Sequence, residues 1–165
     1  DAQAELRDTY DGSPHAHACV MRRVLEVTDR IAQVGIRNYS QQEYLDCPRQ
    51  VENFVTPAVI ESDPGWVDRV LSLLGEKVYV TVDVDGFDPA FVPGTGTPEP
   101  GGRTWRQVTR LLRRVCAERE VVGADIVEVV PIPGQKVSEF LAARLAYKMI
   151  AYIESSRQGA KPCSK

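Results

Sequence analysis

The chain has 165 residues, of which 43% are hydrophobic and 26% charged, a composition typical of a globular protein and unlike that of a disordered one. Its 20 Lys and Arg residues against 23 Asp and Glu give a net charge of -3, which argues against a nucleic-acid-binding protein with a basic face. The unbroken apolar stretches are too short for a membrane-spanning helix. No basic segment followed by an apolar run opens the chain, so we expect no signal peptide.

The first half of the sequence predicts short elements, each bounded by turn residues or proline. They are a helix over 16–27, a strand over 31–36, a helical or irregular segment over 41–50, a strand over 53–60 that Pro57 confines to an end or an edge, and a helix from Asp63-Pro64 to Leu74.

The second half predicts longer elements in the order strand, loop, helix, strand, loop, helix. They are a strand over 78–82, a Gly/Pro-rich loop over 86–102, a helix capped by Thr104 and ending near Arg119, a strand over 121–130 and a helix over 138–155. The near-continuous β-branched run over 78–82 predicts that this first strand is buried on both faces. The order of the elements predicts a parallel sheet with flanking helices. Ligand sites in such sheets lie beyond the carboxyl ends of the strands.

Two aspartates at the end of the first of these strands are the strongest chemical signal. Strand alternation places Asp83 and Asp85 on the same side. Adjacent carboxylates repel each other, so a cation between them is favoured, and oxygen-only ligands suit Mg²⁺ or Mn²⁺. The alternative is a solvated strand end with Asx turns.

The opening segment DAQAE carries polar residues at every second position. Asp1, Gln3 and Glu5 would line one side of an extended segment, where the two carboxylates could join the same metal cluster. The alternative is that they are simply solvated, as terminal polar residues usually are.

The remaining candidates are acids in an apolar strand and two histidines. Asp125 is expected to find a structural partner, for which an arginine is one candidate, whereas Glu128 faces the other side near the carboxyl end, where a cationic ligand fits. His15 and His17 are the only histidines. A lone histidine is more often structural, but its pKa suits proton transfer near neutral pH.

Four stretches together resemble the arginase/agmatinase (ureohydrolase) family, and its agmatinase branch most closely. They are DAQAELRDTYDGSPHAHACVMRR, GIR at 35–37, VTVDVDGFDPAFVPGTGTPEPGG and GADIVEVVP. The resemblance implies an arginase-like α/β fold, a three-layer parallel sheet with flanking helices, that lacks its N-terminal part because family members are nearly twice as long. A ureohydrolase-like domain is expected over 1–155 and a polar tail over 156–165.

The resemblance also implies a reaction and a site. The family hydrolyses a small cationic guanidino compound, such as agmatine, to urea and an amine with two Mn²⁺ ions that share a hydroxide. Asp83 and Asp85 match metal ligands, with Asp83 bridging the ions, and Asp1 matches the other bridging aspartate. His17 matches a histidine that shuttles a proton or contacts substrate. Glu128 matches the acid that holds the guanidinium group.

Two positions depart from the family pattern. Gln3 stands where the family has histidine, and Glu5 stands where it has aspartate. The family takes a further histidine ligand from an upstream segment that is absent here. The alternative to an agmatinase-like hydrolase is therefore a degenerate, inactive member that serves as a structural or guanidinium-binding subunit.

The partners and the location follow from the resemblance and the cysteines. The family implies a homo-oligomer, whereas the charge balance and the short apolar stretches argue against nucleic-acid and membrane partners. The cysteines show neither metal-like nor secretory spacing, which favours reduced thiols and a cytoplasmic protein. They are Cys19, Cys47, Cys116 and Cys163.

Overall fold

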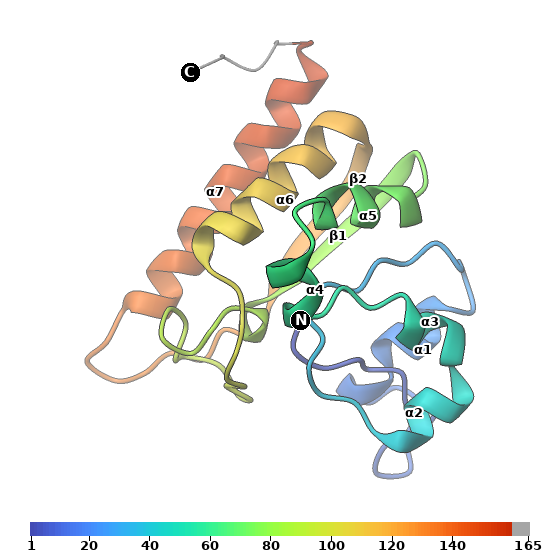
Figure 1. The fold of residues 1–165 in the computed structure, drawn as a ribbon. Helices are drawn as coiled ribbons and strands as arrows, with labels where there is room; N and C mark the ends of the chain where they lie inside the picture. Colours follow the sequence, from blue (N-terminus) through green and yellow to red (C-terminus); the bar gives the residue numbers. More distant parts are fainter. Residues whose placement is uncertain (160–165) are drawn as a thin grey trace. The chain divides into compact units, whose positions relative to one another are not determined.

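The computed structural model describes residues 1–159, and the chain divides into two compact units, Asp1–Leu74 and Gly75–Lys165 (Figure 1). Each unit has its own group of packed apolar side chains. Within residues 1–159, no helix combines the length and the apolar character that a membrane crossing requires.

The first unit consists of short helices joined by extended segments. The helices are η1 (His17–Cys19), α1 (Val20–Val24), α2 (Gln41–Asp46), α3 (Pro48–Glu52), α4 (Pro57–Ser62) and α5 (Trp66–Leu73). Two parallel bridges, Gln3 with Asn38 and Val34 with Val55, connect the extended segments. The core lies between the opening segment, Ile36 and α3.

Several predictions for this unit are wrong in detail. The helix predicted over 16–27 ends at Val24, and the strand predicted over 31–36 is reduced to the single bridge at Val34. The first half of the strand predicted over 53–60 contributes only the bridge residue Val55, and its second half instead begins α4. Local contacts explain why α4 begins here. The Thr56 hydroxyl accepts the Val59 N–H, and Pro57 occupies the first helical position, where its missing N–H costs nothing.

The remaining helices of this unit agree better with expectation. The segment 41–50 is helical but divided into α2 and α3, because Pro48 cannot donate a backbone hydrogen bond and disfavours helical geometry at the residue before it. The predicted N-cap Asp63 does not begin α5 directly. Its carboxylate accepts the Gly65 N–H at 2.7 Å, and α5 starts at Trp66.

The second unit is a β-α-β-α arrangement. Strand β1 (Lys77–Asp83) pairs in parallel with β2 (Glu120–Val127), and α6 (Trp105–Glu118) connects them. The last helix, α7 (Val137–Arg157), lies beside α6, and both contact β2 (Figure 1). The parallel sheet with flanking helices is therefore confirmed.

The expectation that the first strand is buried on both faces is wrong for the described residues. Val78 is buried in β1, but its neighbour Tyr79 is 62% exposed. Within this unit the core lies on the side of α6 and α7, against Val84 and Phe87. The side chains that point the other way in β1 are therefore left exposed.

Local signals explain where the long elements begin and end. The Thr104 side chain accepts the Gln107 N–H and the Gln107 side chain accepts the Thr104 N–H, a reciprocal cap that starts α6 as predicted. β2 ends at Val127 rather than at residue 130, because Glu128 has a left-handed backbone with φ of +64°. The tail predicted from residue 156 begins inside α7, and residues 160–165 lie outside the described part.

The cap of α6 yields a stability prediction. Thr104→Ala removes the oxygen that accepts the Gln107 N–H, so we expect the free energy of unfolding to fall by about 1 kcal/mol. Thr104→Ser keeps that oxygen and should restore most of the loss. Urea denaturation followed by circular dichroism measures both values.

The matched control is Thr109→Ala inside the same helix, where the hydroxyl donates to the Trp105 carbonyl. Because alanine favours the helix interior, this change should be neutral or slightly stabilising. An equal loss in both alanine variants would contradict the capping role.

Candidate functional site

The opening segment presents its polar side chains on one side, as the sequence predicts. Ala2 and Ala4 are buried, with exposed fractions of 0% and 1%, whereas Asp1, Gln3 and Glu5 are partly exposed. One carboxylate oxygen of Asp1 accepts the Gln3 N–H at 2.7 Å. The two candidate acids and Gln3 therefore share one side of an otherwise buried segment.

A buried glutamate holds this segment in place. One carboxylate oxygen of Glu43 accepts the Leu6 N–H at 2.9 Å. Its other oxygen accepts the backbone N–H and the hydroxyl of Ser40, at 2.7 and 2.8 Å. A buried carboxylate is stable only when hydrogen bonds satisfy it, and Glu43 has three. Glu43 is not among the residues predicted for the site, although Ser40 and Glu43 have the spacing of a capping box.

Two buried glutamines extend the same support. The Gln33 amide nitrogen donates to the Ala4 carbonyl at 2.8 Å, and Gln50 donates to the Gln33 side-chain oxygen at 2.9 Å. Both glutamines are less than a tenth exposed. No local pattern marks them, because their partners lie far away in the sequence.

Glu5 carries local backbone strain. Its φ is +53°, in the left-handed region that residues other than Gly, Asn and Asp seldom occupy. Its carbonyl accepts the Arg22 N–H at 3.1 Å, which helps to hold this conformation. Strained residues of this kind occur often at ligand sites.

The histidines lie on the exposed surface of the first unit. His17 opens η1, and its ring meets the Tyr10 ring edge-on at 5.3 Å. The guanidinium carbon of Arg7 lies 5.0 Å from the centre of the same Tyr10 ring. His15 and His17 are both exposed, and the His15 backbone N–H donates to the Ser13 hydroxyl. Both imidazoles are thus accessible to a ligand or to water.

Asp83 and Asp85 lie together in the second unit, but not through strand alternation. β1 ends at Asp83, and the chain then turns through η2 (Val84–Gly86). One Asp83 oxygen accepts the Asp85 N–H at 2.9 Å, and Asp85 accepts the Thr97 hydroxyl at 3.0 Å. The turn and these two bonds orient both carboxylates.

The two carboxylates form an electrostatically unfavourable pair. Asp83 is 5% exposed and Asp85 is 1% exposed. Burial, with a further contribution from the charge of Asp85, raises the pKa of Asp83 to about 7. A divalent cation would relieve both the burial penalty and the repulsion. The donor set fits Mn²⁺ or Mg²⁺ because it consists of oxygen atoms alone.

The loop after β1 brings Glu128 to the same part of the unit. The Gly94 N–H donates to the buried Ser138 hydroxyl at 2.8 Å, and the Gly94 carbonyl accepts the Val130 N–H at 3.0 Å. A Cβ on Gly96 would lie 3.7 Å from a Glu128 carboxylate oxygen. The same loop supplies Thr97 to Asp85, so it links the aspartate pair to Glu128.

A side chain at Gly94 would not fit in this loop. A Cβ there would lie 2.6 Å from the Val130 carbonyl oxygen and 2.7 Å from the Ser138 hydroxyl. The neighbouring Thr95 is 8% exposed, and its hydroxyl has no hydrogen-bond partner among the described residues. The loop is thus tightly packed and holds one unsatisfied polar group beside the candidate site. The loop itself is predicted from its Gly and Pro residues, but none of these contacts is.

The other candidate acid of β2, Asp125, has a structural partner, and it is a tyrosine rather than an arginine. The Tyr79 hydroxyl donates to Asp125 at 2.8 Å across the two strands. The Tyr79 ring crosses over Gly123, where a Cβ would lie 2.6 Å from the ring. Asp125 is therefore tied to β1, whereas Glu128 follows the strand with an exposed side chain.

Comparison with known proteins gives the family. The sequence model described as "Arginase family" matches residues 1–151. The chain is 42% identical over 160 residues to N(1)-aminopropylagmatine ureohydrolase of Synechocystis, covering 96% of this chain and 52% of that protein. It is 38% identical over 150 residues to an agmatinase of Pyrococcus horikoshii, with 91% and 52% covered. The chain thus spans about half the length of the relatives it matches.

Solved structures agree with these relatives. The agmatine ureohydrolase of Thermoplasma volcanium superposes with a TM-score of 0.85 at 34% identity, covering 98% of this chain and 55% of that one. An arginase from Medicago truncatula gives a TM-score of 0.75 at 27% identity, covering 93% and 49%. The fold is therefore the α/β fold of arginases, of which part is missing here. The chain belongs to the arginase family.

Proposed function

We propose that this chain forms the part of a metal-dependent ureohydrolase that carries its carboxylate ligands and its guanidinium-binding acid. The substrate is a linear guanidino compound, agmatine or a close analogue, and the products are urea and an amine. The relatives named as agmatinase and N(1)-aminopropylagmatine ureohydrolase support this reaction. The observation that carries it is the buried pair Asp83 and Asp85, which the loop 94–97 links to Glu128.

Asp83 and Asp85 would hold the metal, and the family resemblance adds Asp1 and Glu5 as ligands from the opening segment. When bound, Mn²⁺ supplies Lewis-acid activation of a water molecule near neutral pH. The Thr97 hydroxyl and the Asp85 N–H each fix one carboxylate by a hydrogen bond. These bonds limit the rotation of the two carboxylates, and one oxygen of Asp83 lies within 4.8 Å of one oxygen of Asp85.

Glu128 would bind and orient the substrate. A carboxylate accepts two parallel N–H bonds from a planar guanidinium group, which fixes the plane of that group. The left-handed backbone of Glu128 ends β2 and directs the following residues back along the loop at Gly94. His17, exposed in the first unit, would donate the proton that the leaving amine requires.

The alternative is an inactive family member, and Gln3 is the observation that favours it. Its amide is a neutral and weak ligand where the family places an imidazole, and Glu5 is one methylene longer than the family's aspartate. An inactive chain would still bind a guanidinium group through Glu128. The homo-oligomer expected from the resemblance and the cytoplasmic location expected from the cysteines stay predictions.

Metal content separates these two functions first. The purified chain is loaded with Mn²⁺, desalted and analysed for metal by elemental analysis. Two ions per chain, followed by urea release from agmatine or aminopropylagmatine, support the hydrolase. Two ions without urea support the inactive member, and one ion or none means that the missing histidine ligands decide the matter.

Glu128→Gln tests the substrate role. We expect at least a tenfold loss of agmatine binding by calorimetry and a matching loss of any urea release, because the amide accepts fewer bonds and carries no charge. Mn²⁺ content should stay unchanged. Glu61→Gln, at an exposed position of α4, is the control and should change neither value. Loss of metal in the Glu128 variant would assign Glu128 to the metal site instead.

The raised pKa of Asp83 predicts a pH dependence of stability. Between about pH 4 and 7 the folded, metal-free chain keeps a proton on Asp83 that the unfolded chain has lost. Stability therefore falls as the pH rises through this range, by at most about 4 kcal/mol. Urea denaturation in EDTA at several pH values measures the slope.

Asp83→Asn removes the titrating group, so this slope should flatten, while the exposed Asp29→Asn should leave it unchanged. Mn²⁺ affinity of the unmodified chain should rise over the same range, because the ion competes with the proton for Asp83. A slope that is identical in all three chains would refute the proton on Asp83.

Restoring the family residues tests the two departures. The double change Gln3→His and Glu5→Asp should tighten Mn²⁺ binding, since imidazole is a better ligand than an amide. Aspartate also tolerates the left-handed backbone of position 5 better than glutamate does. Elemental analysis and Mn²⁺ titration measure the change. Unaltered metal binding would show that these positions do not control the site.

A further inference from the structure

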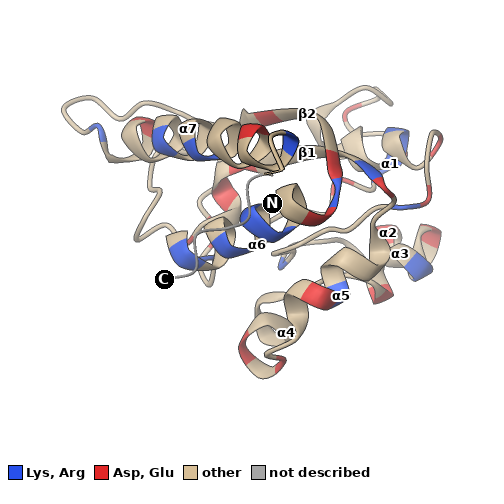
Figure 2. Ribbon diagram, turned by 90° about the horizontal axis from the view of Figure 1, so that it is seen from above, with Lys and Arg blue, Asp and Glu red and all other residues tan. Residues whose placement is uncertain are grey.

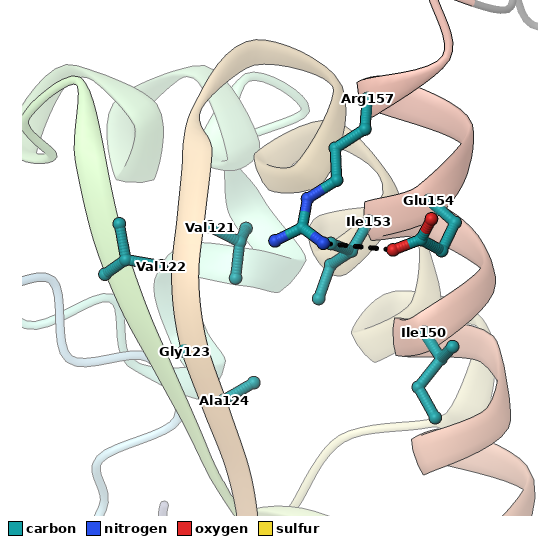
Figure 3. Close-up of a pocket in the computed structure, with 8 residues that line it drawn as sticks. All are labelled: Val121, Val122, Gly123, Ala124, Ile150, Ile153, Glu154 and Arg157. Atoms are coloured by element: carbon teal, nitrogen blue, oxygen red, sulfur yellow. Dashed lines mark hydrogen bonds and ion pairs between the residues drawn. The ribbon is translucent and has the colours of Figure 1, made fainter.

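The hollow between β2 and α7 lies away from the candidate site. It is a groove of about 220 Å³, lined by residues 121–124 of β2 and by Ile150, Ile153, Glu154 and Arg157 of α7 (Figure 3). Glu154 and Arg157 pair with each other at 3.0 Å, and the other side chains that line the groove are apolar. These residues of β2 precede Glu128, whereas Asp83 and Glu128 lie at the carboxyl ends of the two strands. The polar groups around the site come instead from the Gly/Pro-rich loop after β1.

This loop leaves the body of the second unit and returns to it at the same point. Phe87 and Arg103 form a parallel backbone bridge. The Asp88 N–H donates to the Arg103 carbonyl at 3.1 Å, and the Arg103 N–H donates to the Gly86 carbonyl at 2.9 Å. A Cβ on Gly102 would overlap the Phe87 carbonyl group. The two ends of the loop are thus in direct backbone contact.

The Asp88 carboxylate joins these two ends. One of its oxygens accepts the N–H groups of Gly101 and Gly102, at 3.0 and 3.1 Å. The other accepts the Ala90 N–H at 3.0 Å. A charged carboxylate forms stronger hydrogen bonds with backbone N–H groups than a neutral acceptor does. These three bonds, here called the Asp88 clasp, connect the first residues of the loop to its last residues.

The last residues of the loop lead directly into α6, which is firmly packed. The Thr104 cap fixes the first turn of this helix. α6 buries Leu112, Val115 and Cys116, and Figure 2 shows basic residues repeated along it. This is the pattern of a helix that packs on one side and faces water on the other. The far end of the loop is therefore anchored, and the Asp88 clasp connects the near end to that anchor.

The closed loop carries the hydroxyl that holds Asp85. The Thr97 hydroxyl donates to an Asp85 carboxylate oxygen at 3.0 Å. Thr97 lies between two fixed points of the loop, which are the contact of Gly94 with Ser138 and the Asp88 clasp. Loss of the clasp would lengthen the free segment, and Thr97 would lose more conformational entropy when it binds Asp85. The Asp85 carboxylate would then be oriented less firmly.

We propose that Asp88 is a positioning residue of the candidate metal site, because it closes the loop that keeps Thr97 on Asp85. Among the described residues, its carboxylate is not part of the cluster of oxygens that includes Asp83 and Asp85, so it acts through the loop rather than as a ligand. The proposal rests on the proposed function, in which Asp83 and Asp85 bind the metal. Groups that orient metal ligands without touching the ion typically change metal affinity by roughly 10- to 100-fold when they are removed.

Asp88→Asn tests the clasp in the metal-free chain. Asparagine has one accepting oxygen, so it cannot serve Ala90 and the two glycines together. In EDTA, the backbone amides of the loop should exchange with solvent markedly faster in this variant. Asp125→Asn is the matched control, because the Asp125 carboxylate also joins two segments, through Tyr79, but lies outside the loop. Hydrogen exchange in the loop should be the same in this control as in the unmodified chain.

A double-mutant cycle with Thr97→Val shows whether Asp88 acts through Thr97. Thr97→Val removes the hydroxyl that donates to Asp85, whereas Thr97→Ser keeps it. Because residues of one hydrogen-bond network are coupled, the losses of unfolding free energy for Asp88→Asn and Thr97→Val in EDTA should sum to more than the loss in the double variant. Strictly additive losses, or unchanged loop exchange in Asp88→Asn, would overturn the proposal.

Mn²⁺ titration measures the consequence for the site. Asp88→Asn and Thr97→Val should each weaken Mn²⁺ binding by roughly tenfold, and the double variant should be little weaker than either. Asp125→Asn and Thr97→Ser should bind Mn²⁺ like the unmodified chain. Full Mn²⁺ affinity in Asp88→Asn would overturn the positioning role. An unmodified chain that binds no Mn²⁺ would count against the proposed function instead, while hydrogen exchange and the cycle in EDTA would still decide the role of Asp88.

Discussion

Two carboxylates buried side by side form the constraint around which the second unit is organised. Asp83 and Asp85 are almost fully removed from water, and the pKa of Asp83 is raised to about 7 by that burial and by its neighbour's charge. Such a pair is unfavourable without a cation, so the surrounding structure must hold it together. The turn after β1 and the Thr97 hydroxyl do so, and the Gly94–Ser138 contact fixes the loop that carries Thr97. The fold is therefore stabilised around a site whose own charges oppose folding.

The sequence predicts the second unit better than the first for a physical reason. β1, β2, α6 and α7 are long enough for period and capping to agree, as in the Thr104 cap and the apolar run of β1. In the first unit the elements are short, and a run such as 53–60 fits a strand or a helix equally well. Pro57 decided this case, because it suits the first turn of a helix better than a sheet.

The candidate site can likewise be predicted from the sequence only in part. Residue type and spacing along the chain were enough to select Asp83, Asp85 and Glu128 as candidates, because each lies at or just after the end of a strand of a parallel pair. The supports of the site could not be found in this manner. Glu43 reaches Leu6 across 37 positions and Ser138 reaches Gly94 across 44, and only the folded chain reveals such bonds. Asp125 has the structural partner that the sequence predicts, but only the folded chain shows that this partner is Tyr79.

The left-handed backbone of Glu128 places stability and substrate binding in opposition at this position. Glycine at this position would relax the backbone strain, because it adopts positive φ without a steric penalty. The same exchange would delete the carboxylate proposed to hold the guanidinium group. A library selected only for thermal resistance should therefore enrich glycine at position 128, and one selected for turnover should reject it. Position 128 is thus where stability and activity would be traded against each other.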